Sequence, residues 1–268
     1  MSDLVYRGMS REQLDRAYNN RAAVADSHAI MEGWTQRSQA VQAPAGVDLD
    51  LPYGPRPRER IDLYLAGAGA PVLLFLHGGY WQMNRREDFR FVAEGPLAHG
   101  ISVAIGGYTL APELDLPGMV EEVRQMVAWL RARLGGRILL AGWSAGAHLA
   151  ASAMDHPDVA GGLAISGIYD LEPIRHSYLN AKLGLDRAAA AQASPLWHLP
   201  ARSGPLDVAF GELELPELAR QSADYWQAWR GAGLRGELAA LGGHNHFTIL
   251  DELAAPQGRL ARMVAGRA

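Results

Sequence analysis

Short apolar runs alternate with segments of helical periodicity along most of the chain. The apolar runs predict strands, because strands buried on both faces carry few polar positions. The predicted strands cover 61–65, 72–76, 101–105, 138–141, 163–165, 208–210 and 238–241. The clearest helical pattern between them places Val123, Met126 and Leu130 on one stripe. This alternation predicts an α/β fold, with a mostly parallel central sheet flanked by helices.

The first 45 residues have a different pattern, polar and helical. Ser10 and Gln13 form a capping box that opens one helix, and a second helix is predicted over 25–39. Prolines then interrupt the chain between positions 44 and 57. Two short helices bury too little apolar surface to fold alone. We therefore expect an N-terminal helical arm, residues 1–45, laid over a catalytic domain of residues 46–268.

The composition limits the classes of protein to consider. With 49% hydrophobic and 20% charged residues in 268 positions, the chain is not disordered or fibrous. It contains no cysteine, which excludes disulfides, thiolate metal sites and a cysteine nucleophile. A net charge of −4 argues against nucleic acid as a partner. No secretory signal or membrane span is visible, so a cytoplasmic location without membrane contact is expected.

One motif points to a nucleophile. Gly142-Trp143-Ser144-Ala145-Gly146 lies between a predicted strand and a helix of small residues. A bare G-x-S-x-G is a weak signal, but on a strand-to-helix turn the serine is held exposed in strained backbone. The helix N-terminus beside it offers free N–H groups to a developing anion. We predict that Ser144 is a nucleophile.

A second motif supports the first. His77-Gly78-Gly79-Tyr80-Trp81 follows the predicted strand 72–76 directly. Two glycines at a strand end can have no role beyond forming a turn. Glycines there can also allow backbone N–H groups to approach a substrate oxygen. We predict an oxyanion hole made by the N–H groups of Gly78, Gly79 and Ala145.

The general base is expected near the C-terminus. Leu241-Gly242-Gly243-His244-Asn245-His246-Phe247 follows the last predicted strand. His246 is the predicted base because it precedes Phe247 and an apolar helix that would anchor the loop; His244 is the alternative. A metal site on the two histidines is disfavoured, because no third ligand completes it.

The acid that orients this histidine is expected on the loop after the strand 208–210. Glu212, Glu214 and Glu217 compete for this role. Glu214 is favoured because it precedes Pro216, the predicted start of the next helix. Glu212 is second, and Glu217 is assigned to the first turn of that helix as a partner of its dipole.

Several other features have structural explanations. Gly231–Gly236 matches a dinucleotide-binding motif but follows a helix and precedes a strand, the reverse of the required order. Glu121 and Glu122 are expected on the solvated face of their helix. His148 is expected to be a packed helix residue, and the aromatic cluster within 225–229 is expected in the core.

The order of HGGYW, GWSAG and a late histidine resembles the α/β-hydrolase fold. More narrowly, the chain is similar to the kynurenine formamidase (arylformamidase) group, close to the hormone-sensitive-lipase-like esterases. The similarity covers nearly the whole chain. It includes the arm segment 6–21, the segments 107–113 and 215–222, and His246-Phe247.

The resemblance places the catalytic aspartate of that group on Glu214, which is one methylene longer. It thereby supports Glu214 over Glu212, and the longer side chain favours a substrate other than that of the group's namesake. Tyr80 and Trp81 become candidates for stacking on an aryl ring. For Trp81, structural support under the loop is an equal alternative.

The function implied is that of a serine hydrolase acting on a small-molecule acyl amide or ester. The main expectation is cleavage of N-formylkynurenine to kynurenine and formate, a step of tryptophan catabolism, without metal or cofactor. One alternative is a broad-specificity carboxylesterase for short-chain aryl or alkyl esters. Another is an inactive hydrolase scaffold used for binding. The resemblance also implies a homodimer.

Overall fold

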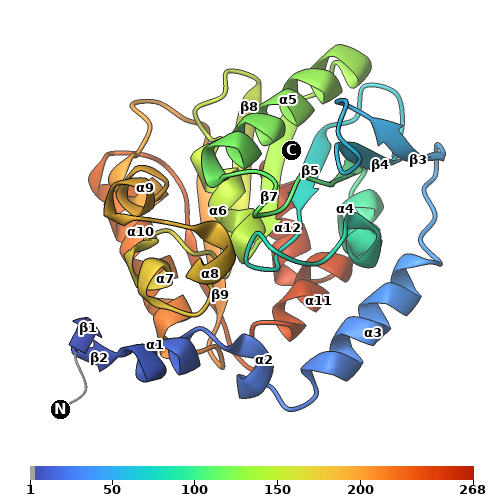
Figure 1. Ribbon diagram of the computed structural model, residues 1–268. Helices are drawn as coiled ribbons and strands as arrows, with labels where there is room; N and C mark the ends of the chain where they lie inside the picture. The colour runs from blue at the N-terminus through green and yellow to red at the C-terminus, as the bar shows by residue number, and fades with distance from the viewer. Residues whose placement is uncertain (1–3) are drawn as a thin grey trace.

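An eight-stranded sheet forms the centre of the structure, a computed structural model that describes residues 4–268 (Figure 1). Its order is β10 (Leu238–Leu241), β9 (Leu206–Gly211), β8 (Val159–Ile165), β7 (Ile138–Trp143), β5 (Val72–Leu76), β6 (Ser102–Gly106), β4 (Arg60–Tyr64) and β3 (Val47–Pro52). The strands from β10 to β6 are parallel, whereas β4 pairs antiparallel with both β6 and β3. The predicted α/β fold with a mostly parallel sheet is confirmed.

All seven predicted strands are present, and β3 is the strand of this sheet that was missed. It lies at the sheet edge, where Asp48 and Asp50 are exposed. An edge strand faces solvent and carries few apolar residues. With these aspartates and the neighbouring prolines, β3 therefore lacks a clear alternation of apolar and polar residues. A short hairpin of β1 (Leu4–Tyr6) and β2 (Met9–Ser10) was also not predicted.

Each face of the sheet has its own hydrophobic core. In β5, Leu74 and Leu76 enter one core, while Leu73 and Phe75 enter the other, as the pleat of a strand requires. The first core is covered by α5 (Leu116–Leu134), α6 (Ala145–Ser152) and α10 (Pro216–Gly231). The second is covered by α3 (Ser27–Ser38), η1 (Arg86–Ala93), α4 (Glu94–Ala98), η3 (Thr248–Leu250), α11 (Asp251–Ala254) and α12 (Arg259–Ala265). Between β8 and β9 lie α7 (Glu172–His176), α8 (Asn180–Leu183), α9 (Arg187–Gln192) and η2 (Pro195–Trp197).

The arm consists of α1 (Arg11–Ala17), α2 (Asn20–Ala23) and α3, which run along the lower edge of the molecule in Figure 1. The predicted capping box at Ser10 and Gln13 is present. Tyr18 is fully buried, and its hydroxyl accepts from Nε2 of Gln221 on α10 at 2.9 Å. Trp34 enters the core of the opposite face. The arm therefore belongs to both cores, and an independent boundary near residue 45 stays a prediction.

The structure tests the residues to which the sequence assigned a purely structural role. Glu121 is exposed as expected, but the prediction was wrong for Glu122, which is 3% exposed. The Glu122 carboxylate accepts from the Thr109 N–H at 2.7 Å and from Arg56 at 3.0 Å, and burial raises its pKa. The core assignment is confirmed for Tyr225 and Trp229, which are fully buried, whereas Trp226 is only partly buried against the same core. Gly231–Gly236 is indeed the helix-to-strand connection between α10 and β10.

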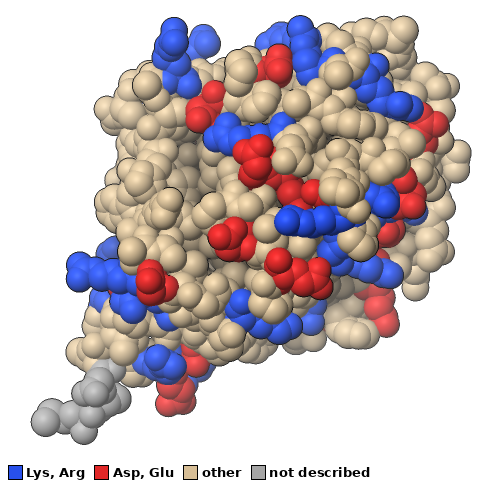
Figure 2. Space-filling model, turned by 45° about the horizontal axis from the view of Figure 1, so that its top comes forward, with Lys and Arg blue, Asp and Glu red and all other residues tan. Residues whose placement is uncertain are grey.

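The surface carries charges of both signs. On the face seen in Figure 2, basic and acidic side chains are interspersed, without a large region of one sign. Within residues 4–268, no helix has both the length and the apolarity needed to cross a membrane.

Candidate active site

Ser144 lies on a tight turn between β7 and α6. Its backbone has φ +57° and ψ −118°, a conformation that side chains rarely adopt. The turn is possible because Gly146 has no side chain: a Cβ there would collide with the carbonyl oxygens of Leu76 and His77. The Ser144 N–H donates to the Ile165 carbonyl at 2.8 Å, which ties the turn to β8. The sheet therefore holds this serine at the carboxyl ends of its central strands.

His246 and Glu214 form a buried pair on two neighbouring loops of the sheet. Nδ1 of His246 lies 2.9 Å from Oε2 of Glu214, and the two side chains are 4% and 0% exposed. His246 follows β10, and its loop is anchored by the buried Phe247. The indole N–H of Trp143, beside Ser144, donates to the His246 carbonyl at 2.8 Å. A carboxylate in this position fixes the Nδ1–H tautomer and leaves Nε2 free to accept a proton.

The other oxygen of Glu214 is also held. Oε1 accepts from the Ser166 hydroxyl at 2.6 Å and from the Gly211 N–H at 2.7 Å. Ser166 follows β8 directly and is fully buried, with φ +53°. Ser166 was not predicted from the sequence. One signal was available in the sequence. Ser166 is a small polar residue at the carboxyl end of β8, the strand adjacent to β9, and the acid was expected at the carboxyl end of β9.

The competing residues lie elsewhere. Glu212 is exposed, and Glu217 contacts Arg220 at 2.8 Å in the first turn of α10. His244 Nε2 lies 3.3 Å from Glu252. The structure thus brings Glu214, and neither of its rivals, to His246.

The predicted oxyanion loop adjoins Ser144. A Cβ on Gly78 would lie 2.9 Å from the Cβ of Ser144, so this backbone touches the serine. Gly79 has φ +119°, and a Cβ there would strike the Met83 carbonyl, which explains why glycine is needed. Within residues 4–268, the N–H groups of Gly78, Gly79 and Ala145 have no acceptor. Their role as oxyanion donors stays a prediction, supported by these free donors beside Ser144.

The two aromatic residues of the same loop have different surroundings. Tyr80 lines the pocket that contains Ser144. Trp81 is fully buried outside that pocket, and its indole N–H donates to Nδ1 of His148 at 3.2 Å. Nε2 of His148 in turn contacts the Ala193 carbonyl at 2.7 Å. The structure therefore favours the supporting role for Trp81 rather than contact with substrate, and it confirms His148 as a packed helix residue.

Buried histidines around the site are held neutral. Burial lowers the pKa of His148 to about 4, and it does the same for His77 at the start of the oxyanion loop. The His77 ring stacks on Tyr108 with centroids 4.5 Å apart. Both histidines act in this structure as neutral packing and hydrogen-bonding groups.

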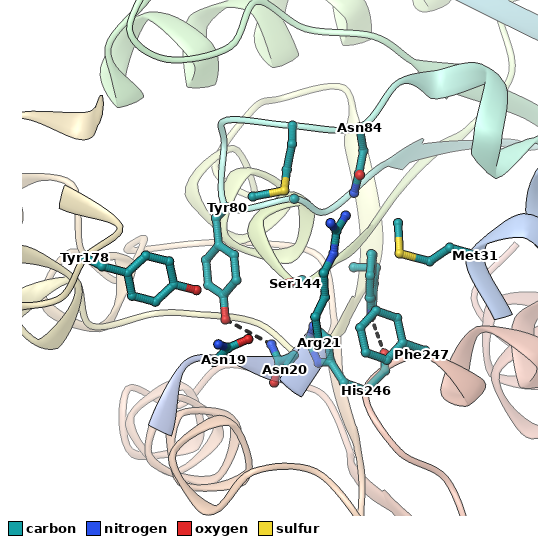
Figure 3. A pocket seen from close by; sticks show the side chains of 13 residues that line it. Asn19, Asn20, Arg21, Met31, Tyr80, Asn84, Ser144, Tyr178, His246 and Phe247 are labelled. Atoms are coloured by element: carbon teal, nitrogen blue, oxygen red, sulfur yellow. Dashed lines mark hydrogen bonds between the residues drawn. The ribbon is translucent and has the colours of Figure 1, made fainter. Parts of the chain in front are cut away.

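Ser144 and His246 share one pocket, partly open to solvent, with residues of the arm (Figure 3). Asn19 caps α2 by accepting from the Ala22 N–H at 3.1 Å, which fixes the start of this four-residue helix. Asn20 and Arg21 follow on α2 and line the pocket. These arm residues were not predicted, because nothing local in the sequence indicates where the arm crosses the sheet.

Comparisons with known proteins identify the family of this chain. A family model described as the α/β-hydrolase fold matches residues 73–249. The chain is 30% identical to the kynurenine formamidase of Danio rerio, with 98% of each chain covered, and 31% identical to that of Salmo salar, with 97% of each covered. The crystal structure of a proposed thioesterase from Silicibacter sp. TM1040 superposes with a TM-score of 0.87 at 28% identity, over 93% of this chain and 98% of that one.

The family match covers more than half of the chain, and the relatives extend it through the arm. This chain belongs to the α/β-hydrolase fold family and is a hydrolase related to the kynurenine formamidases.

Proposed function

We propose that this protein is an arylformamidase that cleaves N-formylkynurenine to kynurenine and formate. The observation that carries the proposal is the assembly of Ser144 with the His246–Glu214 pair at one small pocket. Similarity to kynurenine formamidases over the full chain supports the choice of substrate. A cytoplasmic location and a homodimer, both expected from the sequence, stay predictions.

The geometry suggests how the reaction proceeds. Ser144 Oγ attacks the formyl carbon while Nε2 of His246 takes the hydroxyl proton, and Glu214 stabilises the imidazolium. The N–H groups of the oxyanion loop stabilise the negative oxygen. When the C–N bond breaks, His246 returns the proton to the departing aryl amine. Water, deprotonated by His246, then attacks the formyl ester and releases formate, which restores Ser144.

The pocket suits a small aromatic substrate. Aromatic side chains of Tyr80, Trp143 and Phe247 line it, and such faces favour an aryl ring. The acyl group needs little room, because formyl is the smallest acyl group.

The glutamate in place of the family's aspartate favours, from sequence alone, a substrate other than that of the namesake. Its longer side chain nevertheless contacts His246 at 2.9 Å, because Ser166 and Gly211 hold the carboxylate in place. The substitution is therefore compatible with the formamidase reaction, and ester hydrolysis becomes an outcome to test.

The test compares kcat/KM for N-formyl-L-kynurenine, p-nitrophenyl acetate and p-nitrophenyl butyrate. We expect about 10⁴ M⁻¹s⁻¹ or more for the formyl substrate, well above both esters. Ser144→Ala is the control and should abolish all three activities. Ester hydrolysis with negligible formamidase activity would contradict the proposal and indicate a carboxylesterase. Failure of a fluorophosphonate to label Ser144 would indicate an inactive scaffold.

A further inference from the structure

Two neighbouring arm residues line the pocket with unused hydrogen-bonding capacity. Asn20 and Arg21 are the first residues of α2, and both line the pocket that holds Ser144 (Figure 3). Neither has a part in the acyl-transfer steps above. Their surroundings indicate what kind of ligand group each could bind.

The orientation of the Asn20 amide follows from its neighbours. The Tyr80 hydroxyl donates its proton to the Tyr18 carbonyl, so its oxygen must act as an acceptor toward Asn20. It accepts from Asn20 Nδ2 at 2.9 Å. This fixes Oδ1 as the remaining amide atom. Asn20 is only 5% exposed, and among residues 4–268 its Oδ1 has no donor. A buried acceptor without a donor is unfavourable, and Oδ1 is closed to solvent here, so a small shift of α2 that lets a ligand donor reach this atom is favoured.

Arg21 is a cation at the same pocket. No carboxylate among residues 4–268 lies within 4 Å of its guanidinium. The acidic residues of the adjoining groove have other contacts. Glu32 lies 3.6 Å from His28, and Asp88 lies 3.2 Å from Arg85. Arg21 therefore remains available to an anionic ligand, for which its planar fork of donors is well suited.

We propose that Asn20 and Arg21 form a subsite for the amino-acid tail of an aryl substrate. Arg21 binds the α-carboxylate, and Oδ1 of Asn20 accepts from the α-ammonium group. The inference rests on the proposed function, since N-formylkynurenine carries such a tail on its ring. It adds that the arm selects aryl amides or esters that have a charged α-amino-acid group over neutral ones of the same size.

A subsite of this kind acts on binding more than on the chemical step. The tail lies away from the bond that breaks, so its contacts are similar in the bound substrate and in the transition state. Loss of such a contact raises KM and leaves kcat nearly unchanged. A residue that only supports the fold would affect all substrates alike.

The decisive experiment compares N-formyl-L-kynurenine with 2-formamidoacetophenone, which has the same formanilide and no tail. We expect Arg21→Gln to raise KM about tenfold for the first substrate and to leave the second unchanged. Arg21→Lys should restore part of the loss. Arg11→Gln, at an exposed arm position outside the pocket, is the matched control and should change neither. Equal effects of Arg21→Gln on both substrates, or no effect on either, would overturn the proposal.

A third substrate tests Asn20. The analogue 4-(2-formamidophenyl)-4-oxobutanoate keeps the carboxylate and lacks the ammonium group. Wild-type protein should prefer N-formyl-L-kynurenine over this analogue, and Asn20→Ala should remove the preference while Arg21→Gln weakens both substrates. A preference that persists in Asn20→Ala would refute the role of Oδ1.

A pair of esters separates this inference from the proposed function. The acetate ester of ortho-tyrosine carries the tail, and ortho-tolyl acetate does not. If N-formylkynurenine is not hydrolysed, the formamidase proposal fails, but Arg21→Gln should still raise KM for the tailed ester alone. If Arg21→Gln raises KM equally for both esters, the subsite proposal is refuted as well.

Discussion

The pocket has a sheet side, formed by Ser144, His246 and Glu214, and an arm side, formed by Asn20 and Arg21. The two sides differ in how their buried polar groups are paired. On the sheet side, Glu214 has both oxygens engaged, by His246, Ser166 and the Gly211 N–H. On the arm side, Asn20 is also buried but leaves Oδ1 without a donor among residues 4–268. Groups that move protons must be held in place before substrate arrives, whereas groups that recognise substrate must keep capacity for it. The pairing of each side therefore matches the role we assign to it.

The largest effect is expected where the sheet side is changed by one atom. In Glu214→Gln, the amide oxygen should occupy the position of Oε1, because Ser166 and Gly211 both donate there. The amide NH₂ would then face His246 Nδ1 and donate to it. That fixes the tautomer with a proton on Nε2, which cannot accept the proton of Ser144. We expect kcat to fall by about 10³- to 10⁴-fold, measured by steady-state kinetics with near-native thermal stability.

Ser166→Ala gives a graded control for this prediction. It removes one of two donors to Oε1 and leaves the contact between Glu214 and His246 intact. We expect kcat to fall only about tenfold, with KM unchanged. If Ser166→Ala were as damaging as Glu214→Gln, the carboxylate would depend on Ser166 for its position, and the tautomer argument would not be needed.

Acid should destabilise the fold through two buried histidines near Ser144. Burial lowers the pKa of His77 and His148 to about 4, from an ordinary value of 6.5. Between these values the unfolded chain takes up protons that the folded chain does not. The free energy of unfolding therefore has its full value, as far as these histidines affect it, above about pH 6.5, and it decreases as the pH falls toward 4. We expect a loss of up to roughly 3 kcal/mol per histidine, measured as the free energy of urea unfolding between pH 4.5 and 7.5.

His148→Gln sharpens the pH prediction. Glutamine can accept the Trp81 indole N–H that His148 Nδ1 now accepts, and it does not titrate. The free energy of unfolding of this variant should fall less steeply as the pH is lowered, because its unfolding takes up about one proton fewer than that of the wild type. Identical pH dependence in the variant and the wild type would show that His148 does not contribute.

The two sides also differ in how far the sequence predicts them. The central strands, Ser144 and His246 could be predicted, because each follows from a local pattern of apolar runs and motif residues. The choice of Glu214 among three glutamates needed a family resemblance in addition to its place before a helix. Ser166 and Asn20 could not be predicted, since their roles depend on contacts between segments far apart in the chain.

The same limit explains Glu122 and Trp81. Charged helix residues usually face solvent, but Glu122 is buried by Arg56 and the backbone of Thr109, which precede it on other segments. Trp81 follows Tyr80 in the motif, yet the two rings enter different environments. Local sequence placed both aromatic residues beside the nucleophile. It did not show which one faces the pocket.

The smallest effect is expected at Tyr80, which links the two sides. Its hydroxyl donates to the Tyr18 carbonyl and accepts from Asn20, so Tyr80→Phe removes the polar link between the oxyanion loop and the arm. We expect a loss of about 1–2 kcal/mol in stability, because two buried partners lose a hydrogen bond. KM for N-formyl-L-kynurenine should rise a few-fold while kcat stays within about twofold, because the groups at Ser144 are unchanged.

Tyr225→Phe is the matched control for this change. Tyr225 is also fully buried, but its hydroxyl has no hydrogen-bond partner among residues 4–268, and its ring stacks on Tyr169. Its loss should leave stability and KM near wild type. A fall in kcat for Tyr80→Phe at unchanged KM would place Tyr80 with the chemical machinery of the sheet side. A rise in KM alone places it with the arm, where the recognition of substrate is decided.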